Sequence, residues 1–267
     1  MKKNFTKVIA LGAAAVMAAM ALASCGAKNA DTTTEGGELI MGTNAAFPPF
    51  EFVTTNGLVD EFDGIDVAIA KKIADDNGMT LKISDQEFDG LISAVSTGKV
   101  DMVVAGMTAT DERRQNVDFS DTYYVASQVI VVPEGSDIAS AEDLKNDKKV
   151  GVVLGYTGDL IVTDDLQLDD ANVTRANRGI DIVQDVKNGK LDAVVIDSAT
   201  GKALAAANGL QVVEDAEAFE TEEYAIAVKK GNTELLDKIN ATLAEMKASG
   251  EIDALAVRYD GAGEDAE

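Results

Sequence analysis

Two stretches of the chain repeat one pattern at a distance of 91 residues. Residues 91–106 read LISAVSTGKVDMVVAG and residues 182–197 read IVQDVKNGKLDAVVID, so that Val, Gly, Lys, Asp, Val and Val recur at matching places. Each copy predicts a helix with one apolar face, a Gly-Lys turn, and a short apolar strand of the kind that is buried on both faces of a parallel sheet. The repeat predicts an α/β chain with two similar lobes, each a mainly parallel sheet flanked by helices.

The two predicted strands lead to residues of opposite charge. Gly106 closes the first strand, and Thr108, a helix start at Thr110 and then Arg113 follow it, whereas the second strand ends in Asp197. Ligands of open α/β sheets bind outside the carboxyl ends of the strands, and Arg binds carboxylates through two parallel hydrogen bonds. A zwitterion held between the lobes satisfies both ends. The alternatives are a surface Arg113 that balances its acidic neighbours and an Asp197 solvated at the strand end.

Composition excludes several classes of function. The formal net charge is −24, and a surface this acidic repels nucleic acid. The chain has no His, and its single Cys is Cys25, so we expect no metal, no cofactor, no disulfide and no His-assisted catalytic triad in the folded part.

The amino terminus has the order of an export signal. Lys2, Lys3 and Lys7 precede an apolar run over residues 8–23, which is short for a permanent membrane span. Residues 26–37 are polar, as in a flexible tether. The segment LASCG (22–26) resembles the processing box of bacterial lipoproteins. It implies a signal peptide over 1–24, a lipid on Cys25 and a tether over 25–37. The alternative is cleavage after Ala23, which leaves Cys25 as a free thiol.

Several longer segments resemble the extracytoplasmic solute-binding proteins that deliver polar amino acids to ABC importers. The resemblance covers about residues 38–260 and is carried by MGTNAAFPPFEF (41–52), FDGIDVAIAKKIA (62–74), FDGLISAVSTGKVDMVVAGMTATDERRQNVDFSDTYY (88–124), KVGVVLGYTGD (149–159), LDAVVID (191–197) and EEYAIAVKKGNTELLDKIN (222–240). It implies a clamshell in which two crossing hinge strands join the lobes, which close over one amino acid. The tail VRYDG (257–261) departs from the aromatic ending that is common in the family.

The resemblance also implies the division of the chain, its place and its partners. We expect lobe 1 over residues 38–127 and 225–267, and lobe 2 over residues 128–224. We further expect a monomer, held outside the cytoplasm at the cell membrane through Cys25, that passes its ligand to an ABC permease.

The ligand-binding residues follow from the resemblance position by position. Arg113 should clamp the α-carboxylate, assisted by Thr108 and by the backbone of Thr157. Asp197 and the carbonyl of Gly106 should hold the α-ammonium. Phe47 and Phe88 occupy positions that stack on the ligand's side chain, although core packing is the alternative for each of them.

Asn44 occupies the position that reads the ligand's side chain in the family, where many members that select basic amino acids or glutamine carry Asp. An amide supplies no counter-charge for Lys or Arg, so a neutral polar amino acid such as glutamine or cystine is the favoured ligand. Arg178 lies in a lobe 2 loop, and an acidic ligand would be favoured if it reaches the cleft.

Two other classes of function stay open. The same clamshell can serve as the ligand-sensing input of a signalling partner, and some dehydratases resemble this fold and use carboxylates in the cleft as acid and base. We expect a transport protein and no enzyme.

Overall fold

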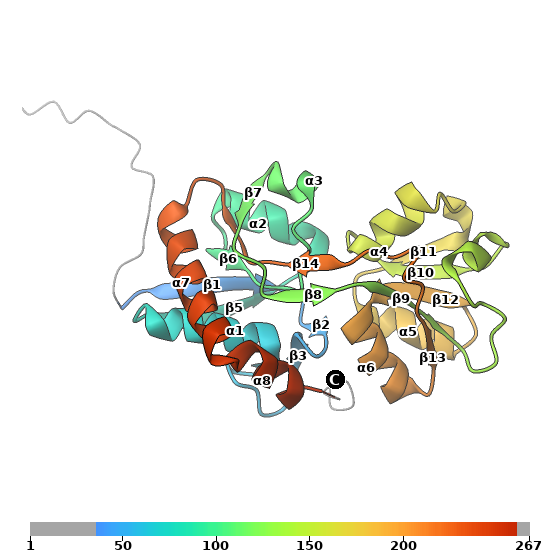
Figure 1. Cartoon of the computed structure of the whole chain (residues 1–267), viewed down its shortest axis with the longest axis horizontal. Helices are drawn as coiled ribbons and strands as arrows, with labels where there is room; N and C mark the ends of the chain where they lie inside the picture. The colour runs from blue at the N-terminus through green and yellow to red at the C-terminus, as the bar shows by residue number, and fades with distance from the viewer. Residues whose placement is uncertain (1–35, 261–267) are drawn as a thin grey trace, which may run out of the picture. The chain divides into compact units, whose positions relative to one another are not determined.

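The first sheet of the computed structural model, which describes residues 36–260, contains five strands (Figure 1). Their order across the sheet is β5 (Thr80–Asp85), β1 (Glu38–Thr43), β6 (Met102–Val103), β15 (Ala227–Lys229) and β7 (Val117–Phe119). β1 pairs in parallel with β5 and β6, whereas β15 runs antiparallel to β6 and β7. Four of the five strands therefore point in one direction.

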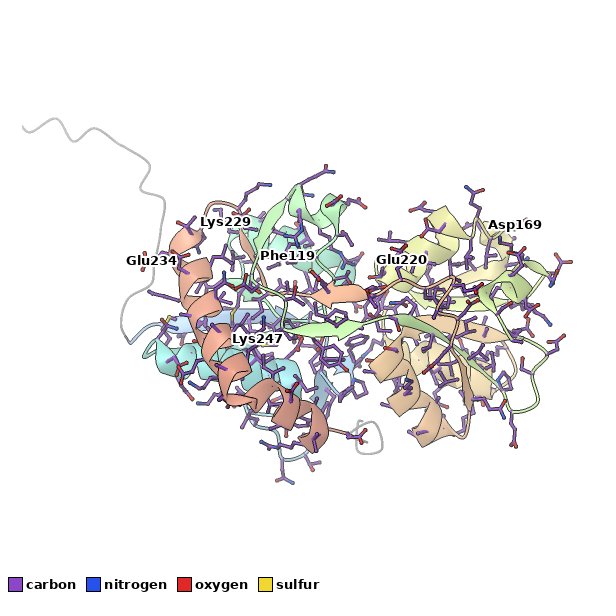
Figure 2. All side chains as sticks on the ribbon, viewed as in Figure 1. Phe119, Asp169, Glu220, Lys229, Glu234 and Lys247 are labelled. Carbon is purple, nitrogen blue, oxygen red and sulfur yellow. The ribbon has the colours of Figure 1, made fainter. Side chains whose placement is uncertain are left out.

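Helices with one apolar face pack on this sheet. They are α1 (Ile65–Asp76), α2 (Leu91–Thr97), α7 (Thr233–Ser249) and α8 (Glu251–Arg258). Ile65, Ile69 and Ile73 recur every four residues on α1, so all three lie on the face that is buried against β5 and α7. Side chains fill the space around this sheet in Figure 2, where Phe119 of β7 is buried and Lys247 of α7 is exposed.

The second sheet has the same arrangement of strands. Its order is β11 (Val173–Ala176), β10 (Val150–Val153), β12 (Ala193–Asp197), β9 (Gln128–Val132) and β13 (Gln211–Val213). β10 pairs in parallel with β11 and β12, and β9 is antiparallel to β12 and β13. Its helices are α4 (Thr157–Leu160), α5 (Gly179–Lys187), α6 (Ser198–Asn208), η2 (Ala141–Lys145), η3 (Ile161–Asp165) and η4 (Asp170–Asn172).

The chain passes between the two sheets twice. β8 (Tyr124–Ala126) lies between β7 and β9 in sequence, and β14 (Glu222–Tyr224) lies between β13 and β15. The two crossing strands pair antiparallel and lie side by side in Figure 1. Beside the first sheet stand a small sheet of β2 (Ala46–Phe47), β3 (Glu51–Val53) and β4 (Phe62–Asp63), and the short helices η1 (Phe88–Gly90) and α3 (Asp111–Arg114).

The sequence repeat corresponds to a structural repeat. α2 and β6 form the first copy and α5 and β12 the second, and both β6 and β12 occupy the third place in their sheets. Gly98 ends α2 and Gly189 follows α5, each with the positive φ that the predicted turn requires. The predicted α/β class, with two similar lobes and two crossing strands, is confirmed.

The predictions for the amino-terminal segment lie outside the described residues. These are the signal peptide over 1–24, the lipid on Cys25 and most of the tether. Within residues 36–260, none of the helices has the length and apolar character needed to cross a bilayer.

Candidate functional site

The carboxyl ends of β6 and β12 contribute residues to one small cavity. Its volume is about 10 Å³, and it is lined by Phe47, Phe88, Ala105, Gly106, Arg113, Tyr156, Thr157 and Asp197. The structure thus brings together residues that the sequence predicted to surround a ligand. The other two predicted residues, Asn44 and Thr108, are each one hydrogen bond from the lining, through Tyr156 and Thr157. Space of this size admits about one water molecule, so the site must widen to admit an amino acid.

Arg113 is a buried cation whose guanidinium contacts neutral oxygens. Its backbone N–H donates to Thr110 Oγ1, which caps the single turn of α3. Nη1 donates to the carbonyl of Thr108 at 2.8 Å and Nη2 to the carbonyl of Gly155 at 2.9 Å, while the guanidinium carbon lies 5.2 Å from the centre of the Phe88 ring. Only 9% of the residue is exposed.

The charge on Arg113 has no direct ionic partner in the described part of the chain. Among residues 36–260 no carboxylate forms an ion pair with it. Burial lowers the pKa of Arg113, and the more distant charges of Asp197 and Glu222 oppose that shift. Guanidinium stays protonated in proteins, so the buried cation favours an anion in the cavity.

Asp197 is the corresponding buried acid. It ends β12, occupies the position just before α6 without a side-chain capping hydrogen bond, and is 3% exposed. The hydroxyl of Tyr224 donates to its Oδ1, and no cation in the described part of the chain forms an ion pair with it. Burial, followed by the nearby charge of Glu222, raises the pKa of Asp197 to about 7. An ammonium group would offset both effects, because an opposite charge favours the ionised carboxylate.

Gly106 brings the backbone close to the aromatic part of the cavity. Its φ is +50°, and a Cβ at this position would lie 2.4 Å from Cε1 of Phe47. Its N–H donates to Asp66 Oδ2 at 2.7 Å, and the same oxygen accepts from the Tyr123 hydroxyl at 2.8 Å. The sequence predicted a role for Gly106 but gave no sign of Asp66, which fixes the Gly106 backbone.

Asp66 and the neighbouring Glu51 are both fully buried acids. Burial raises the pKa of Asp66 to about 6. Burial, followed by the charge of Asp66, raises the pKa of Glu51 well above its usual range. Burial and the nearby charge of Asp66 therefore both favour the protonated form of Glu51.

Thr108 and Thr157 belong to a chain of hydrogen bonds that ends on the crossing strand β14. Thr157 Oγ1 donates to Thr108 Oγ1 at 3.1 Å, and Thr108 Oγ1 donates to Glu222 Oε2 at 2.7 Å. The other oxygen of Glu222 accepts from Gln128 Nε2 at 3.0 Å. Sequence reasoning missed Glu222 because it follows several acids, among them Glu214, Asp215, Glu217 and Glu220, with nothing in the local pattern to single it out.

The aromatic part of the cavity centres on Tyr156, which was not among the ligand-binding residues predicted from the sequence. The Tyr156 ring lies 5.3 Å from the Phe47 ring and 4.5 Å from the Phe88 ring, centroid to centroid. Its hydroxyl donates to Asn44 Oδ1 at 3.0 Å. Asn44 Nδ2 donates to the carbonyl of Gln86 at 3.0 Å, which accepts only, so the amide oxygen of Asn44 is the atom turned toward Tyr156.

Arg178 reaches the loop that carries Asn44. Its Nη2 donates to the carbonyl of Ala45 at a long 3.4 Å, and the residue is half-buried. The cation therefore lies near the loop that carries Asn44 while remaining partly exposed.

The chain is similar to known proteins along most of its length. The family described as bacterial extracellular solute-binding proteins, family 3, matches residues 39–262. A probable histidine-binding protein from Neisseria gonorrhoeae is 36% identical, over 96% of this chain and 96% of its own length. The arginine-binding extracellular protein ArtP of Bacillus subtilis (strain 168) is 37% identical, over 90% of this chain and 92% of its own. Among solved structures, an ancestral arginine-binding protein bound to glutamine is 43% identical with a TM-score of 0.77, covering 84% of this chain and 98% of that one.

Proposed function

The chain belongs to family 3 of the bacterial extracellular solute-binding proteins, and we propose that it binds one free amino acid between its two sheets and delivers it to an ABC import permease. Family membership confirms the resemblance found in the sequence. The observation that supports amino acid binding most is the buried Arg113, which faces neutral carbonyls beside a cavity that also contains the buried Asp197.

In the proposed complex the α-carboxylate lies on the guanidinium of Arg113. It replaces the Gly155 carbonyl, which now accepts from Nη2. Thr108 and the backbone of Thr157 complete the carboxylate site. The α-ammonium lies between Asp197 and the carbonyl of Gly106, and the side chain extends between Phe47 and Phe88 toward Asn44. Opposite charges on opposite sheets would make closure depend on an intact zwitterion.

We propose a neutral polar amino acid as the ligand, with glutamine ahead of cystine. The oxygen of Asn44 faces the aromatic part of the cavity, so it accepts from a side-chain N–H and disfavours a carboxylate. Arg178 beside Ala45 makes a cationic side chain less favourable. The relatives carry names for histidine and arginine binding, and one similar structure holds glutamine, so the fold itself does not decide between charged and neutral ligands.

A thermal-shift screen tests the proposed function. The folded protein is heated with each of the twenty amino acids and with cystine, because a ligand that binds only the folded state raises the apparent unfolding temperature. Glutamine should give the largest shift. Recovery of unchanged glutamine from the complex separates binding from a dehydratase-like reaction. Absence of a shift with every amino acid would contradict the proposal.

For the cellular location we propose an exported lipoprotein anchored through Cys25. The family is extracytoplasmic, and the support for the anchor is the segment LASCG (22–26) in the sequence. Labelling cells with a clickable fatty acid should mark the unmodified protein and not Cys25→Ala. An equally labelled Cys25→Ala would argue against this anchor. Transport activity that depends on a co-expressed permease would separate import from a signalling role.

A further inference from the structure

Two residues of the loop between β10 and α4 lie in the part of the cavity that should receive the ligand. Gly155 and Tyr156 lie between β10, which ends at Val153, and α4, which begins at Thr157. The backbone of this segment is held locally, since Tyr156 N–H donates to the Val153 carbonyl and Gly155 N–H donates to Asp159 Oδ2 at 3.1 Å. The Gly155 carbonyl and the Tyr156 ring contact residues of the first lobe, Arg113 for the carbonyl and Phe47 and Phe88 for the ring.

The Gly155 carbonyl occupies the carboxylate position of the site. It accepts from Arg113 Nη2 at 2.9 Å, and Arg113 is the residue proposed to bind the ligand's α-carboxylate. A carbonyl oxygen carries a partial negative charge, so it supplies Arg113 with a weaker version of the interaction that a carboxylate would give.

The Tyr156 ring occupies the side-chain position of the site. Both of its ring contacts are with first-lobe residues proposed to flank the ligand's side chain, Phe47 and Phe88, and its hydroxyl donates to the proposed reader Asn44. Although its backbone belongs to the second lobe, the ring is buried by the first, with 4% exposed. With the ring in place, the cavity is too small for any amino acid.

We propose that Gly155 and Tyr156 form an internal competitor that imitates a bound amino acid, with the carbonyl in place of the carboxylate and the phenol in place of the side chain. The inference rests on the proposed function, since it assumes the same ligand position. A ligand must displace both groups. Its apparent affinity is therefore reduced by the fraction of molecules in which the internal competitor is withdrawn.

The same contacts hold the two lobes together without a ligand. The Arg113–Gly155 and Tyr156–Asn44 hydrogen bonds each join a residue of the first lobe to one of the second. Removing the phenol should therefore have two separate effects, tighter ligand binding and a more open ligand-free protein.

The decisive variants are Tyr156→Ala, which removes the ring, and Tyr156→Phe, which removes only the hydrogen bond to Asn44. The control is Tyr259→Phe, because Tyr259 is also a buried tyrosine whose hydroxyl bonds to a polar side chain, Asp63, but it lies outside the cavity. Calorimetry with L-glutamine measures affinity, and small-angle scattering of the ligand-free proteins measures the radius of gyration.

We expect Tyr156→Ala to bind L-glutamine at least about tenfold more tightly than the unmodified protein and to have a larger ligand-free radius. Tyr156→Phe should have a glutamine affinity and a ligand-free radius between those two proteins. Tyr259→Phe should match the unmodified protein in both. Weaker or equal glutamine binding by a folded Tyr156→Ala would overturn the internal competitor, because the ring would then be a wall of the ligand site or irrelevant to it. An unchanged ligand-free radius would also overturn it. If neither the unmodified protein nor Tyr156→Ala bound any amino acid, the proposed function itself would fail.

Discussion

At the scale of single residues, the site is a set of buried charges whose partners are neutral. Arg113 and Asp197 occupy the ends of two equivalent strands, and each bonds to oxygen or hydroxyl groups instead of an opposite charge. Burying an unpaired ion costs several kcal/mol. The burial of these two charges should therefore destabilise the ligand-free protein more than it destabilises the complex.

Arg113→Ala should weaken amino acid binding by about 3 to 5 kcal/mol, the typical loss when one partner of a buried pair is removed. This corresponds to a hundredfold to several thousandfold increase in Kd. Arg114→Ala is the matched control, because Arg114 is the next residue on α3 and stacks on Phe119 at the surface. Calorimetry should show little change in amino acid affinity for Arg114→Ala. A loss of less than about fivefold in Arg113→Ala would remove Arg113 from the site.

Asn44→Asp should shift selectivity toward cationic amino acids. A carboxylate beside the aromatic rings would attract arginine or lysine and repel glutamate, whereas the native amide offers only partial charges. Competition binding with glutamine, cystine, glutamate and arginine measures the change. Arginine binding tightest to the unmodified protein would contradict the assigned role of Asn44, and glutamate binding tightest would indicate that Arg178 sets the preference.

Asp197 should make the ligand-free protein less stable as pH rises from about 4 to about 7. The pKa of Asp197 is about 7 in the fold against an ordinary 3.8, so between these values the folded state keeps a proton that the unfolded state releases. The stability gained from that proton is present below the lower pKa and is lost through the upper one. Urea unfolding of Asp197→Asn should show a shallower decline over this window. Asp66, with a pKa of about 6, contributes with the same sign in both proteins. Equal slopes of unfolding free energy against pH in the unmodified protein and Asp197→Asn would contradict the raised pKa of Asp197.

At the scale of elements, two glycines flank β6, with Gly98 before it at the end of α2 and Gly106 after it, and only Gly106 lines the cavity. Gly106 and Gly98 both have positive φ, +50° and +76°, but they differ in their neighbours. A Cβ on Gly98 would meet nothing within 4 Å, whereas one on Gly106 would meet the Phe47 ring.

Gly106→Ala should therefore lower both stability and affinity, while Gly98→Ala should lower stability alone. The left-handed backbone costs a non-glycine residue about 1 to 2 kcal/mol at either position. Only Gly106→Ala also displaces the ring that should contact the ligand. Denaturation and calorimetry on the pair separate the two effects. Unchanged glutamine affinity in Gly106→Ala would show that the Phe47 ring is not part of the ligand site.

Regular elements were predictable because their signals are local. The repeat predicted α2 with β6 and α5 with β12. The strand of the first copy is only Met102–Val103, because its pairing with β1 spans only those residues. The site was predictable only in part. Thr108 and Glu222 meet across 114 positions of sequence, and the ring of Tyr156 leaves its own lobe, so no local pattern marks either contact.

At the scale of the whole molecule, binding requires two lobes that separate and close again. Several hydrogen bonds of the site span the lobes, among them Arg113 to Gly155, Tyr156 to Asn44, and Thr157 to Thr108. An amino acid cannot enter a cavity of about 10 Å³ while all of them hold. The ligand-free protein must therefore visit an open form, and the ligand shifts the population only by its higher affinity for the closed one.

Saturating L-glutamine should reduce the radius of gyration of the unmodified protein in small-angle scattering, because it converts open molecules into closed ones. The reduction should be larger in Tyr156→Ala, since that variant lacks the ring that holds part of the ligand-free population closed. Arg113→Ala at the same glutamine concentration is the control for non-specific effects and should show no reduction. An unchanged radius in the unmodified protein, with glutamine bound as judged by calorimetry, would argue for a rigid pocket. In that case a population shift could not be the means by which this fold captures its ligand.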